Sequence, residues 1–446
     1  MTSPNIVVSA KDARKIAMGA FVGTALEWYD YFLFGTAAAI VFNRLYFTDL
    51  NPTAALLASF ATFGVGFVSR PIGALIFGAI GDRIGRRPAL ITTIVLIGIS
   101  TGLIGVLPTF VSIGVAAPIM LAILRLVQGF AVGGEWGGAT TMAVEHSPVE
   151  TRGRYAALVQ LGSPVGTILS SAAIALVLLL PPESFDAWGW RLPFLAAFPL
   201  LGVALWMRRQ MEESPVFLEI EASAEKKPRV PALAVFRRAP GRLLAGIAAC
   251  MLGVGGFYVM TTLIIAYATT TLGVPREQVV NATLIAAFGQ FIALLICGRL
   301  VDRFGAPRMT IAGAIITALV AFPVFWLVDT ANPVLITLAI CLGTMSIDIV
   351  YASTGKLLSE MFQPELRYTG VSVSFQFAGA VGGFVPMITT ALLAANGNQT
   401  WIAAVILIAI CAFTAVGGFF GSRMRVQDRV VSAEHAPTAA RVDAAS

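Results

Sequence analysis

Six ionisable residues interrupt stretches of sequence that are otherwise apolar, and their side chains can bind an anion or carry a proton. These residues are Glu27, Asp30, Arg70, Arg125, Glu135 and Asp348. A charge at the centre of a bilayer costs at least about 2.5–3.5 kcal/mol, so such residues usually face a water-filled cavity or pair with one another. They therefore indicate the path of a polar substrate or an ion.

Glu27 and Asp30 are three residues apart and share one face of a helix, with Tyr31 one turn from Glu27. Arg70 reaches a similar depth in the next apolar stretch and can compensate one of these acids. Arg125 can offer a planar guanidinium fork to a substrate carboxylate, a geometry that lysine lacks. The alternative for both arginines is a buried ion pair that only orients helices. The expected substrate-binding residues are Arg125, Arg70, Tyr31, Gln128, Tyr258 and Gln376.

The acids in these stretches outnumber the arginines, and burial favours the neutral form of a carboxylic acid. At least one acid is therefore expected to change its protonation as the cavity opens to each side. Asp30 is the first candidate for this proton-coupling role, Asp348 is the second, and Glu27 is a third. Glu135 lies among four glycines, which is typical of close helix packing, so it is either a further coupling acid or a structural residue.

The composition places these residues in a membrane. Of the 446 residues, 57% are hydrophobic and only 12% are charged, whereas soluble domains carry roughly 25% charged residues. This composition excludes a soluble enzyme, a nucleic-acid-binding protein and a disordered protein. Four cysteines lie singly in apolar runs and the two histidines are far apart, so we expect no disulfide, metal site or cofactor.

Twelve runs are long enough to cross a bilayer, which takes about 20 apolar residues. They are residues 17–42, 54–80, 89–107, 113–142, 155–180, 192–207, 243–271, 279–298, 309–328, 334–355, 369–394 and 401–420. We therefore expect an all-α membrane protein with twelve transmembrane helices. Its expected parts are an N-terminal segment (1–16), a six-helix bundle (17–209), a polar linker (210–242), a second six-helix bundle (243–420) and a tail (421–446).

The basic residues predict the orientation. Lys and Arg gather in the loops on one side of the expected helices, and the loops on the other side hold only Arg44, Arg191 and Arg276. Basic loops stay in the cytoplasm, so the N-terminal segment, the linker and the tail are expected there. This bias accounts for most of the net charge of +6 without a nucleic-acid partner.

Two loop motifs occur twice and indicate an internal repeat. Gly78-x3-Asp82-Arg83-x-Gly85 returns as Gly298-x3-Asp302-Arg303-x-Gly305, and Glu145-x6-Arg152 returns as Glu360-x6-Arg367. Parallel repeats usually place a substrate site between the two halves near the midplane. The loop charges can lock one conformational state, or they can only fix the topology. The expected gate residues are Asp82, Arg83, Gly85, Arg86, Glu145, Arg152, Asp302, Arg303, Glu360 and Arg367.

These motifs resemble a known family. Residues 81–87 (GDRIGRR) are similar to the signature loop of the major facilitator superfamily, and residues 27–31 (EWYDY), 69–71 (SRP), 125–129 (RLVQG), 133–138 (GGEWGG), 188–194 (WGWRLPF) and 212–215 (EESP) resemble its metabolite:proton symporter family. Within that family the resemblance is greatest to shikimate-transporting members, through residues 63–67 and 129–136. The second signature loop departs from the pattern at Ala306 and Pro307, where basic residues are common.

The resemblance implies two six-helix bundles of the major facilitator fold in a bacterial inner membrane. It implies proton symport of a small organic carboxylate, either a shikimate-like hydroxylated cyclic acid or a dicarboxylate or tricarboxylate. Uptake of a zwitterion such as proline or betaine is the alternative within the family. We expect a monomer whose partners are this substrate, protons and membrane lipids. A membrane enzyme or a receptor is disfavoured, because no HExxH or Asp-rich motif and no signalling domain is present.

Overall fold

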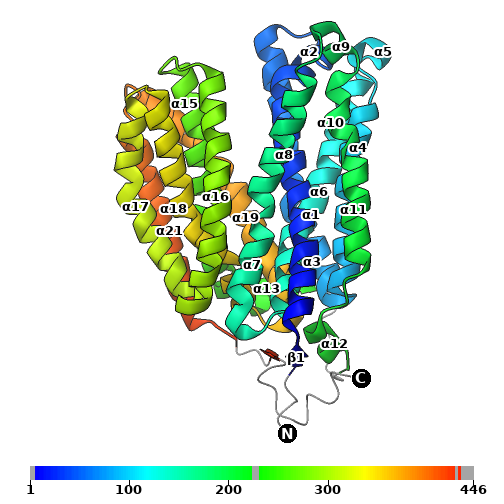
Figure 1. Cartoon of the computed structure of the whole chain (residues 1–446), viewed down its shortest axis with the longest axis vertical. Coiled ribbons are helices and arrows are strands. Elements are labelled where there is room, and N and C mark those ends of the chain that lie inside the picture. Colours follow the sequence, from blue (N-terminus) through cyan, green and yellow to red (C-terminus); the bar gives the residue numbers. More distant parts are fainter. Residues whose placement is uncertain (1–5, 223–230, 427–429, 433–446) are drawn as a thin grey trace.

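In a computed structural model, which describes residues 6–222, 231–426 and 430–432, the chain forms two bundles of long helices that lie side by side (Figure 1). Eleven helical stretches of the described residues are long and apolar enough to cross a membrane. The first expected span is the 28-residue helix α1 (Ala10–Ala37), which carries Glu27 and Asp30 in its second half. With α1 the number of long helices matches the twelve expected, and the all-α membrane fold is confirmed.

The elements of the first half are β1 (Ile6–Val8), α1, the π-helical turn η1 (Ala38–Phe42), α2 (Asn43–Leu45), α3 (Pro52–Arg83), α4 (Arg86–Val106), α5 (Phe110–Ile113), α6 (Ala116–Glu145), η2 (Val149–Thr151), α7 (Arg152–Gln160), α8 (Gly162–Val177), α9 (Pro182–Ala187), η3 (Gly189–Arg191), α10 (Leu192–Leu195) and α11 (Ala197–Arg209). Two short helices, α12 (Pro215–Ala222) and α13 (Pro231–Arg238), lie within the stretch expected as a polar linker. Residues 223–230 of that stretch lie outside the described residues.

The elements of the second half are α14 (Pro240–Met251), the π-helical turns η4 (Leu252–Gly256) and η5 (Val259–Leu263), α15 (Ile264–Thr270), α16 (Arg276–Phe304), α17 (Ala306–Asp329), α18 (Pro333–Met361), η6 (Pro364–Leu366), α19 (Arg367–Gly382), α20 (Val385–Ala395), α21 (Trp401–Arg423) and β2 (Val430–Ser432). β2 lies in the expected tail and pairs in parallel with β1. Both strands are rich in valine, a β-branched residue that favours extended structure.

Matching glycines turn the chain between the second and third long helices of each half. Gly85 (φ +138°) separates α3 from α4, and Gly305 (φ +87°) separates α16 from α17. These backbone angles are readily adopted only by glycine. The two hairpins are therefore built alike, as the repeated motif predicts.

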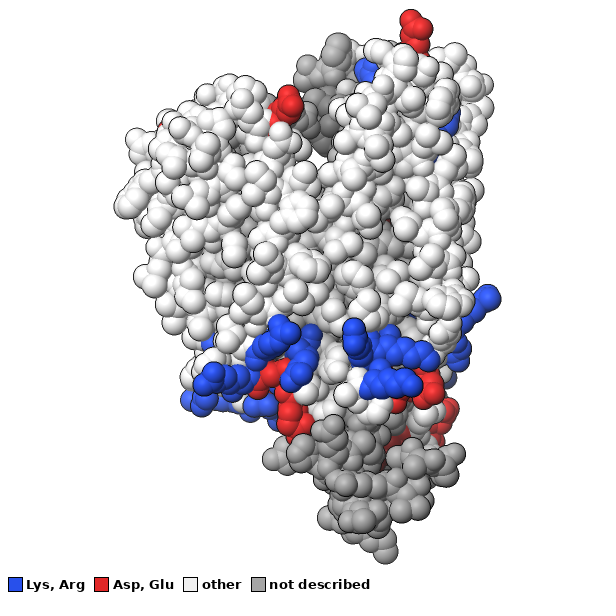
Figure 2. Space-filling view, viewed as in Figure 1, with Lys and Arg blue, Asp and Glu red and all other residues white. Residues whose placement is uncertain are grey.

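The two halves meet through equivalent pairs of helices. α3 of the first half packs against α19 of the second, and α16 of the second half packs against α7 of the first. Lys and Arg gather at one end of the molecule, where β1 also lies (Figure 2, Figure 1). We refer to this end as the basic end. The bundles lie close together there and their ribbons diverge toward the opposite end.

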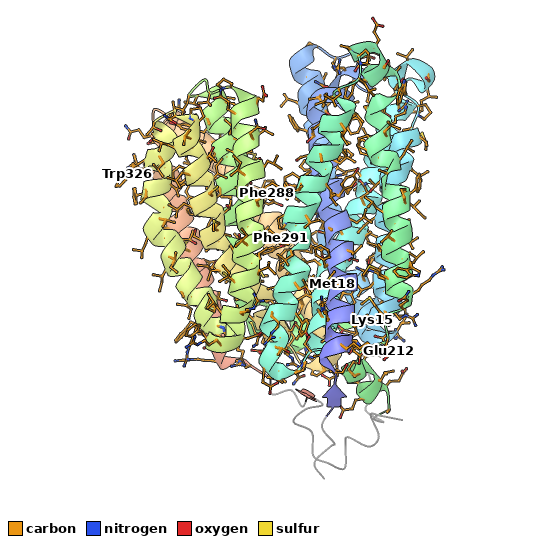
Figure 3. The ribbon with its side chains drawn as sticks, viewed as in Figure 1. Lys15, Met18, Glu212, Phe288, Phe291 and Trp326 are labelled. Atoms are coloured by element: carbon orange, nitrogen blue, oxygen red, sulfur yellow. The ribbon has the colours of Figure 1, made fainter. Side chains whose placement is uncertain are left out.

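The outer surface is apolar, as expected for helices that contact lipid chains. Leu319 is 72% exposed and Trp326 is 64% exposed, and Figure 3 shows Trp326 pointing away from the bundle. The interior holds small and branched apolar residues such as Ala321 and Val324 on the same helix, α17. The buried face and the lipid-exposed face of a helix are therefore both apolar. For this reason the periodicity of apolar residues does not show which face of a helix is buried.

Candidate functional site

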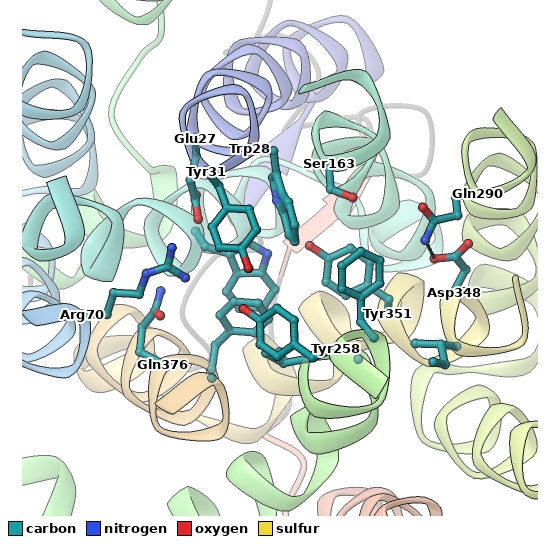
Figure 4. Close-up of a pocket in the computed structure, with 17 residues that line it drawn as sticks. Glu27, Trp28, Tyr31, Arg70, Ser163, Tyr258, Gln290, Asp348, Tyr351 and Gln376 are labelled. Atoms are coloured by element: carbon teal, nitrogen blue, oxygen red, sulfur yellow. Dashed lines mark hydrogen bonds between the residues drawn. The ribbon is translucent and has the colours of Figure 1, made fainter. Parts of the chain in front are cut away.

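A cavity lies between the two halves. Helices α1, α3, α6 and α8 line it from the first half, and η4, α16, α18 and α19 line it from the second (Figure 4). This position is the one that parallel repeats predict. Of the expected site residues, the structure brings six to this cavity: Glu27, Tyr31, Arg70, Tyr258, Asp348 and Gln376.

Arg70 projects into the cavity from α3 (Figure 4). Its guanidinium carbon lies 4.4 Å from the centre of the Phe67 ring and 5.8 Å from that of the Tyr31 ring. In the part of the chain that the structure describes, Arg70 takes part in no ion pair, and its Nε has no hydrogen-bond partner. The expected pairing of Arg70 with an acid of α1 is therefore not formed, and a cation is left for a ligand.

Glu27 lines the same cavity from α1, and Figure 4 shows its carboxylate on the side where Arg70 lies. The side chain is 6% exposed, and among the described residues its Oε2 has no hydrogen-bond partner. Arg70 exerts the strongest attraction on it of the charged groups nearby. An acid and a base thus face one cavity without being bonded to each other.

Asp30 and Arg125 lie outside this cavity, in a buried polar cluster within the first half. Arg125 Nη1 lies 2.9 Å from Asp30 Oδ2, and Asp30 Oδ1 accepts hydrogen bonds from Gln128 Nε2 (2.5 Å) and Thr101 Oγ1 (2.7 Å). The guanidinium carbon of Arg125 also lies 4.4 Å from the centre of the Phe34 ring. Arg125 thus forms the ion pair that was the alternative expectation for it, through Nη1, which also donates to Gln128 Oε1 at 3.2 Å.

Asp348 forms a second polar point on the wall of the second half. Its Oδ1 accepts a hydrogen bond of 3.4 Å from Gln290 Nε2, and its Oδ2 has no partner within the described residues. Figure 4 shows this pair across the cavity from Arg70, with Tyr351 between. The hydroxyls of Tyr31 and Tyr258 point toward each other from opposite halves, and the amide of Gln376 lies beside Arg70.

Aromatic side chains from the two halves stack against each other at the cavity wall. The rings of Trp136 and Phe375 lie 3.6 Å apart at an angle of 12°, and Trp136 Nε1 donates to Gln160 Oε1 at 2.8 Å. Trp28 and Phe257 form a second contact between the halves, with ring centres 5.8 Å apart. These residues were not expected, because nothing in the spacing of Trp136 and Phe375 links two residues so distant in sequence.

Glu135 is bonded within the first half and does not line the cavity. It pairs with Arg208 of α11 and accepts a hydrogen bond from Thr93 Oγ1 at 2.6 Å. Arg208 is 1% exposed, although its position in a basic run before the linker indicated a cytoplasmic loop residue. Arg208 and Thr93 thus bond Glu135 inside the first half, away from the cavity.

At the basic end, carboxylates of each half cap helices of the other half. Asp82 accepts from the backbone N–H groups of Tyr368 (3.0 Å) and Thr369 (2.8 Å), at the start of α19. Asp302 accepts from the N–H groups of Gly153 (2.7 Å) and Arg154 (3.3 Å), at the start of α7. A helix N-terminus attracts negative charge, so both contacts stabilise the closed arrangement of this end.

Glu145 connects further gate residues to this network. It lies 3.2 Å from Arg86 Nε and 3.1 Å from Arg367 Nη1, and it accepts a hydrogen bond from Ser214 Oγ. Arg86 also donates to the carbonyl of Pro364 in the second half at 2.7 Å. The remaining gate residues differ: Arg152 is buried and donates to Ser147 O, Glu360 pairs with Arg425, and Arg83 and Arg303 are exposed.

No group of three His, Cys, Asp or Glu side chains that could hold a metal occurs in the described ranges. The four cysteines Cys250, Cys297, Cys341 and Cys411 are free thiols. The polar groups that line the cavity are one guanidinium, two carboxyls, phenols, amides, indoles and the hydroxyl of Ser163. This set suits the binding of a small polar molecule and the transfer of a proton.

Comparisons with known proteins agree with this geometry. A family profile described as Major Facilitator Superfamily matches residues 20–387 and 255–442. The chain is 40% identical to the shikimate transporter of Escherichia coli K12 over 92% of this chain and 94% of that protein. It is 29% identical to the proline/betaine transporter of Salmonella typhimurium over 91% of this chain and 82% of that protein.

A solved structure of the proton:xylose symporter XylE bound to 6-bromo-6-deoxy-D-glucose superposes with a TM-score of 0.74, covering 95% of this chain and 98% of that one at 17% identity. This likeness concerns the fold. The relatives are membrane transporters and not enzymes. The chain is a multi-pass membrane transporter that belongs to the major facilitator superfamily.

Proposed function

We propose that the chain is a proton-coupled symporter that imports a small organic carboxylate into a bacterium. The observation that carries this proposal is Arg70, a guanidinium that faces a cavity between the halves and pairs with no acid of the described chain. A ligand carboxylate supplies the missing partner through two parallel hydrogen bonds. Gln376 lies beside Arg70 and can donate to the same anion.

Proton coupling follows from the position of Glu27. An ionised Glu27 repels an anionic ligand and attracts Arg70, whereas a protonated Glu27 leaves the positive charge of Arg70 to the ligand. Anion and proton therefore enter the cavity together. Asp30 is the second candidate for the coupling acid. It lies about one turn from Glu27 on α1, where it forms an ion pair with Arg125.

Transport proceeds by alternating access of the two halves. The basic end is the cytoplasmic end by the distribution of Lys and Arg, so both termini lie in the cytoplasm. The contacts of Asp82, Asp302 and Glu145 hold this end closed, and their release opens the cavity to the cytoplasm. We assign the structure to the state that is closed on the cytoplasmic side.

The cavity favours a carboxylate that also carries hydroxyl groups. Asp348 and Gln290 lie across the cavity from Arg70, and Tyr31 and Tyr258 lie between them (Figure 4). These groups can accept hydrogen bonds from the hydroxyls of a compact molecule and donate hydrogen bonds to them. A shikimate-like hydroxylated cyclic acid fits this set. A dicarboxylate or tricarboxylate fits it less well, because its additional carboxylate faces the carboxyl group of Asp348.

A zwitterion is the second candidate substrate. The rings of Trp28, Tyr31, Phe257 and Tyr258 line the cavity near Glu27, and aromatic faces together with a carboxylate hold quaternary or secondary ammonium groups. In that case Arg70 binds the carboxylate of proline or betaine, and Glu27 remains ionised to meet the cation.

Uptake by purified protein in liposomes separates these candidates. Radiolabelled shikimate, 2-oxoglutarate, citrate, proline and betaine are offered with and without an inward proton gradient. Accumulation of shikimate that requires the gradient supports the proposal. Accumulation of proline or betaine alone selects the zwitterion, and gradient-independent equilibration of every compound removes proton coupling.

A further inference from the structure

A groove lies on the lateral surface where the two halves meet at the basic end. α1 and α7 of the first half and α16 of the second half form it. Its residues are Arg14, Arg154, Tyr155, Ala157, Leu158, Leu161, Leu294, Leu295 and Arg299. The groove is separate from the central cavity, because the two share no lining residue.

The groove is lined by arginines toward the basic end and by leucines toward the middle of the molecule. Arg154 of α7 lies seven residues before Leu161, the residue that directly follows this helix, which is about 10 Å along a helix. On α16, which runs in the opposite direction, Arg299 lies five residues beyond Leu294, about 7.5 Å nearer the basic end. The arginines thus lie toward the basic end and the leucines toward the middle of the molecule.

Two of the three arginines of this groove carry a positive charge that no acid of the described chain neutralises. Arg14 and Arg299 are exposed, and in the described chain neither forms an ion pair with an acid; Arg299 Nη1 donates only to Leu295 O of its own helix, at 3.2 Å. Arg154 binds Asp302 at 2.9 Å and is 53% exposed. Three guanidinium groups therefore line the groove, and one of them is paired with a carboxylate.

We infer that this groove is a binding site for an anionic phospholipid of the cytoplasmic leaflet. Arg14, Arg154 and Arg299 hold the phosphate at the level of the headgroups, and Leu158 and Leu295 contact an acyl chain, whereas Leu161 and Leu294 are buried. The alternation of charge and apolar surface over about 10 Å matches the boundary between headgroups and hydrocarbon. A free anion accounts for the arginines but leaves the apolar wall without a ligand.

The site joins the two halves, which gives it a consequence for the transport cycle. Arg14 and Arg154 belong to the first half and Arg299 to the second, and beside the groove Gly298 packs closely on Ala157. Opening of the basic end pulls these arginines apart. A lipid that binds all three therefore favours the closed cytoplasmic side, to the extent that it binds this state more tightly.

Native mass spectrometry of the full chain in a neutral detergent tests the site. The probes are dioctanoyl phosphatidylglycerol, dioctanoyl phosphatidylcholine with the same chains, and glycerol 3-phosphate without chains. We expect phosphatidylglycerol to bind most tightly. The double variant Arg14→Gln/Arg299→Gln is expected to bind it roughly thirtyfold more weakly, from about 1 kcal/mol per basic residue. Arg154 is left intact because it binds Asp302 of the gate.

The matched control is Arg237→Gln/Arg308→Gln, which removes two exposed arginines of the basic end outside the groove. This control is expected to keep the wild-type affinity. Equal weakening in both double variants reduces the effect to overall charge and overturns the site. Binding of glycerol 3-phosphate as tightly as phosphatidylglycerol overturns the lipid assignment in favour of a free anion. Neither outcome depends on which molecule the central cavity transports.

Discussion

Asp82 and Asp302 occupy equivalent positions in the two halves, and each accepts hydrogen bonds from the first N–H groups of a helix in the opposite half. Asp82 caps α19, and Asp302 caps α7. Asp302 is also bound by the side chains of Arg154 and Lys356, whereas Asp82 lies beside the buried Arg86. The repeat is thus preserved in the backbone contacts and differs in the side chains that support them.

The substitution Asp82→Asn is expected to open the basic end more often. Asparagine keeps one acceptor oxygen but loses the charge that interacts with the N-terminus of α19, and a charge-assisted hydrogen bond contributes about 1.5–3 kcal/mol. We expect labelling of Ser163→Cys, a cavity position, by an impermeant thiol reagent from the basic side to accelerate at least about tenfold. Asp329→Asn, at a carboxylate that binds Tyr267 within the second half, is the control. Equal labelling of both variants contradicts the gate.

The substitution Glu27→Gln is expected to uncouple transport from the proton gradient. Glutamine imitates the protonated acid, so Arg70 stays available to an anion at every pH. Exchange of labelled for unlabelled substrate persists, while accumulation driven by an inward proton gradient is lost. Parallel uptake and counterflow measurements in liposomes show the difference. Gradient-driven accumulation at the wild-type level moves the coupling proton away from Glu27.

The substitution Asp30→Asn is expected to impair the fold rather than the coupling alone. It leaves Arg125 buried without its acidic partner, a change that typically costs 3–5 kcal/mol. Exchange and accumulation then fall together, and thermal unfolding of the purified protein shifts to lower temperature. The double variant Asp30→Asn/Arg125→Gln recovers part of the shift. Loss of accumulation with intact exchange and unchanged stability instead assigns the proton to Asp30.

The sequence was sufficient for the spans and the repeat, and of the four acids that it singled out, Glu27 and Asp348 line the cavity whereas Asp30 and Glu135 do not. Apolar runs predict helices because the bilayer imposes both length and composition, and the run expected at 279–298 lies within α16, which spans Arg276–Phe304. The repeated loop motifs predicted that Asp82 and Asp302 act alike, since identical residues at matching loops indicate identical backbones. Arg70 and Glu27 stood out because charge is rare in apolar surroundings.

Pairing between distant helices could not be predicted, because no period links the residues concerned. Arg125 had two possible partners, a ligand or an acid, and only the packing of α6 against α1 shows that Asp30 takes its guanidinium. Arg208 resembled a topology-setting arginine because it follows an apolar run and precedes Arg209. Its burial next to Glu135 depends on how α11 and α6 lie in space.

The substitution Arg70→Lys tests whether the cavity recognises a carboxylate through a planar fork. Lysine keeps the positive charge, so long-range attraction of an anion is unchanged, but it cannot form two parallel hydrogen bonds or stack as a guanidinium does over Phe67. We expect the Kd of the transported carboxylate to rise at least about tenfold, a change of ~1.4 kcal/mol. Arg44→Lys, at an exposed pair with Asp186, is the matched control and leaves the Kd unchanged. Because charge is constant in both variants, equal affinities in Arg70→Lys and the wild type mean that Arg70 acts only as a point charge and that the cavity does not recognise the carboxylate through a planar fork.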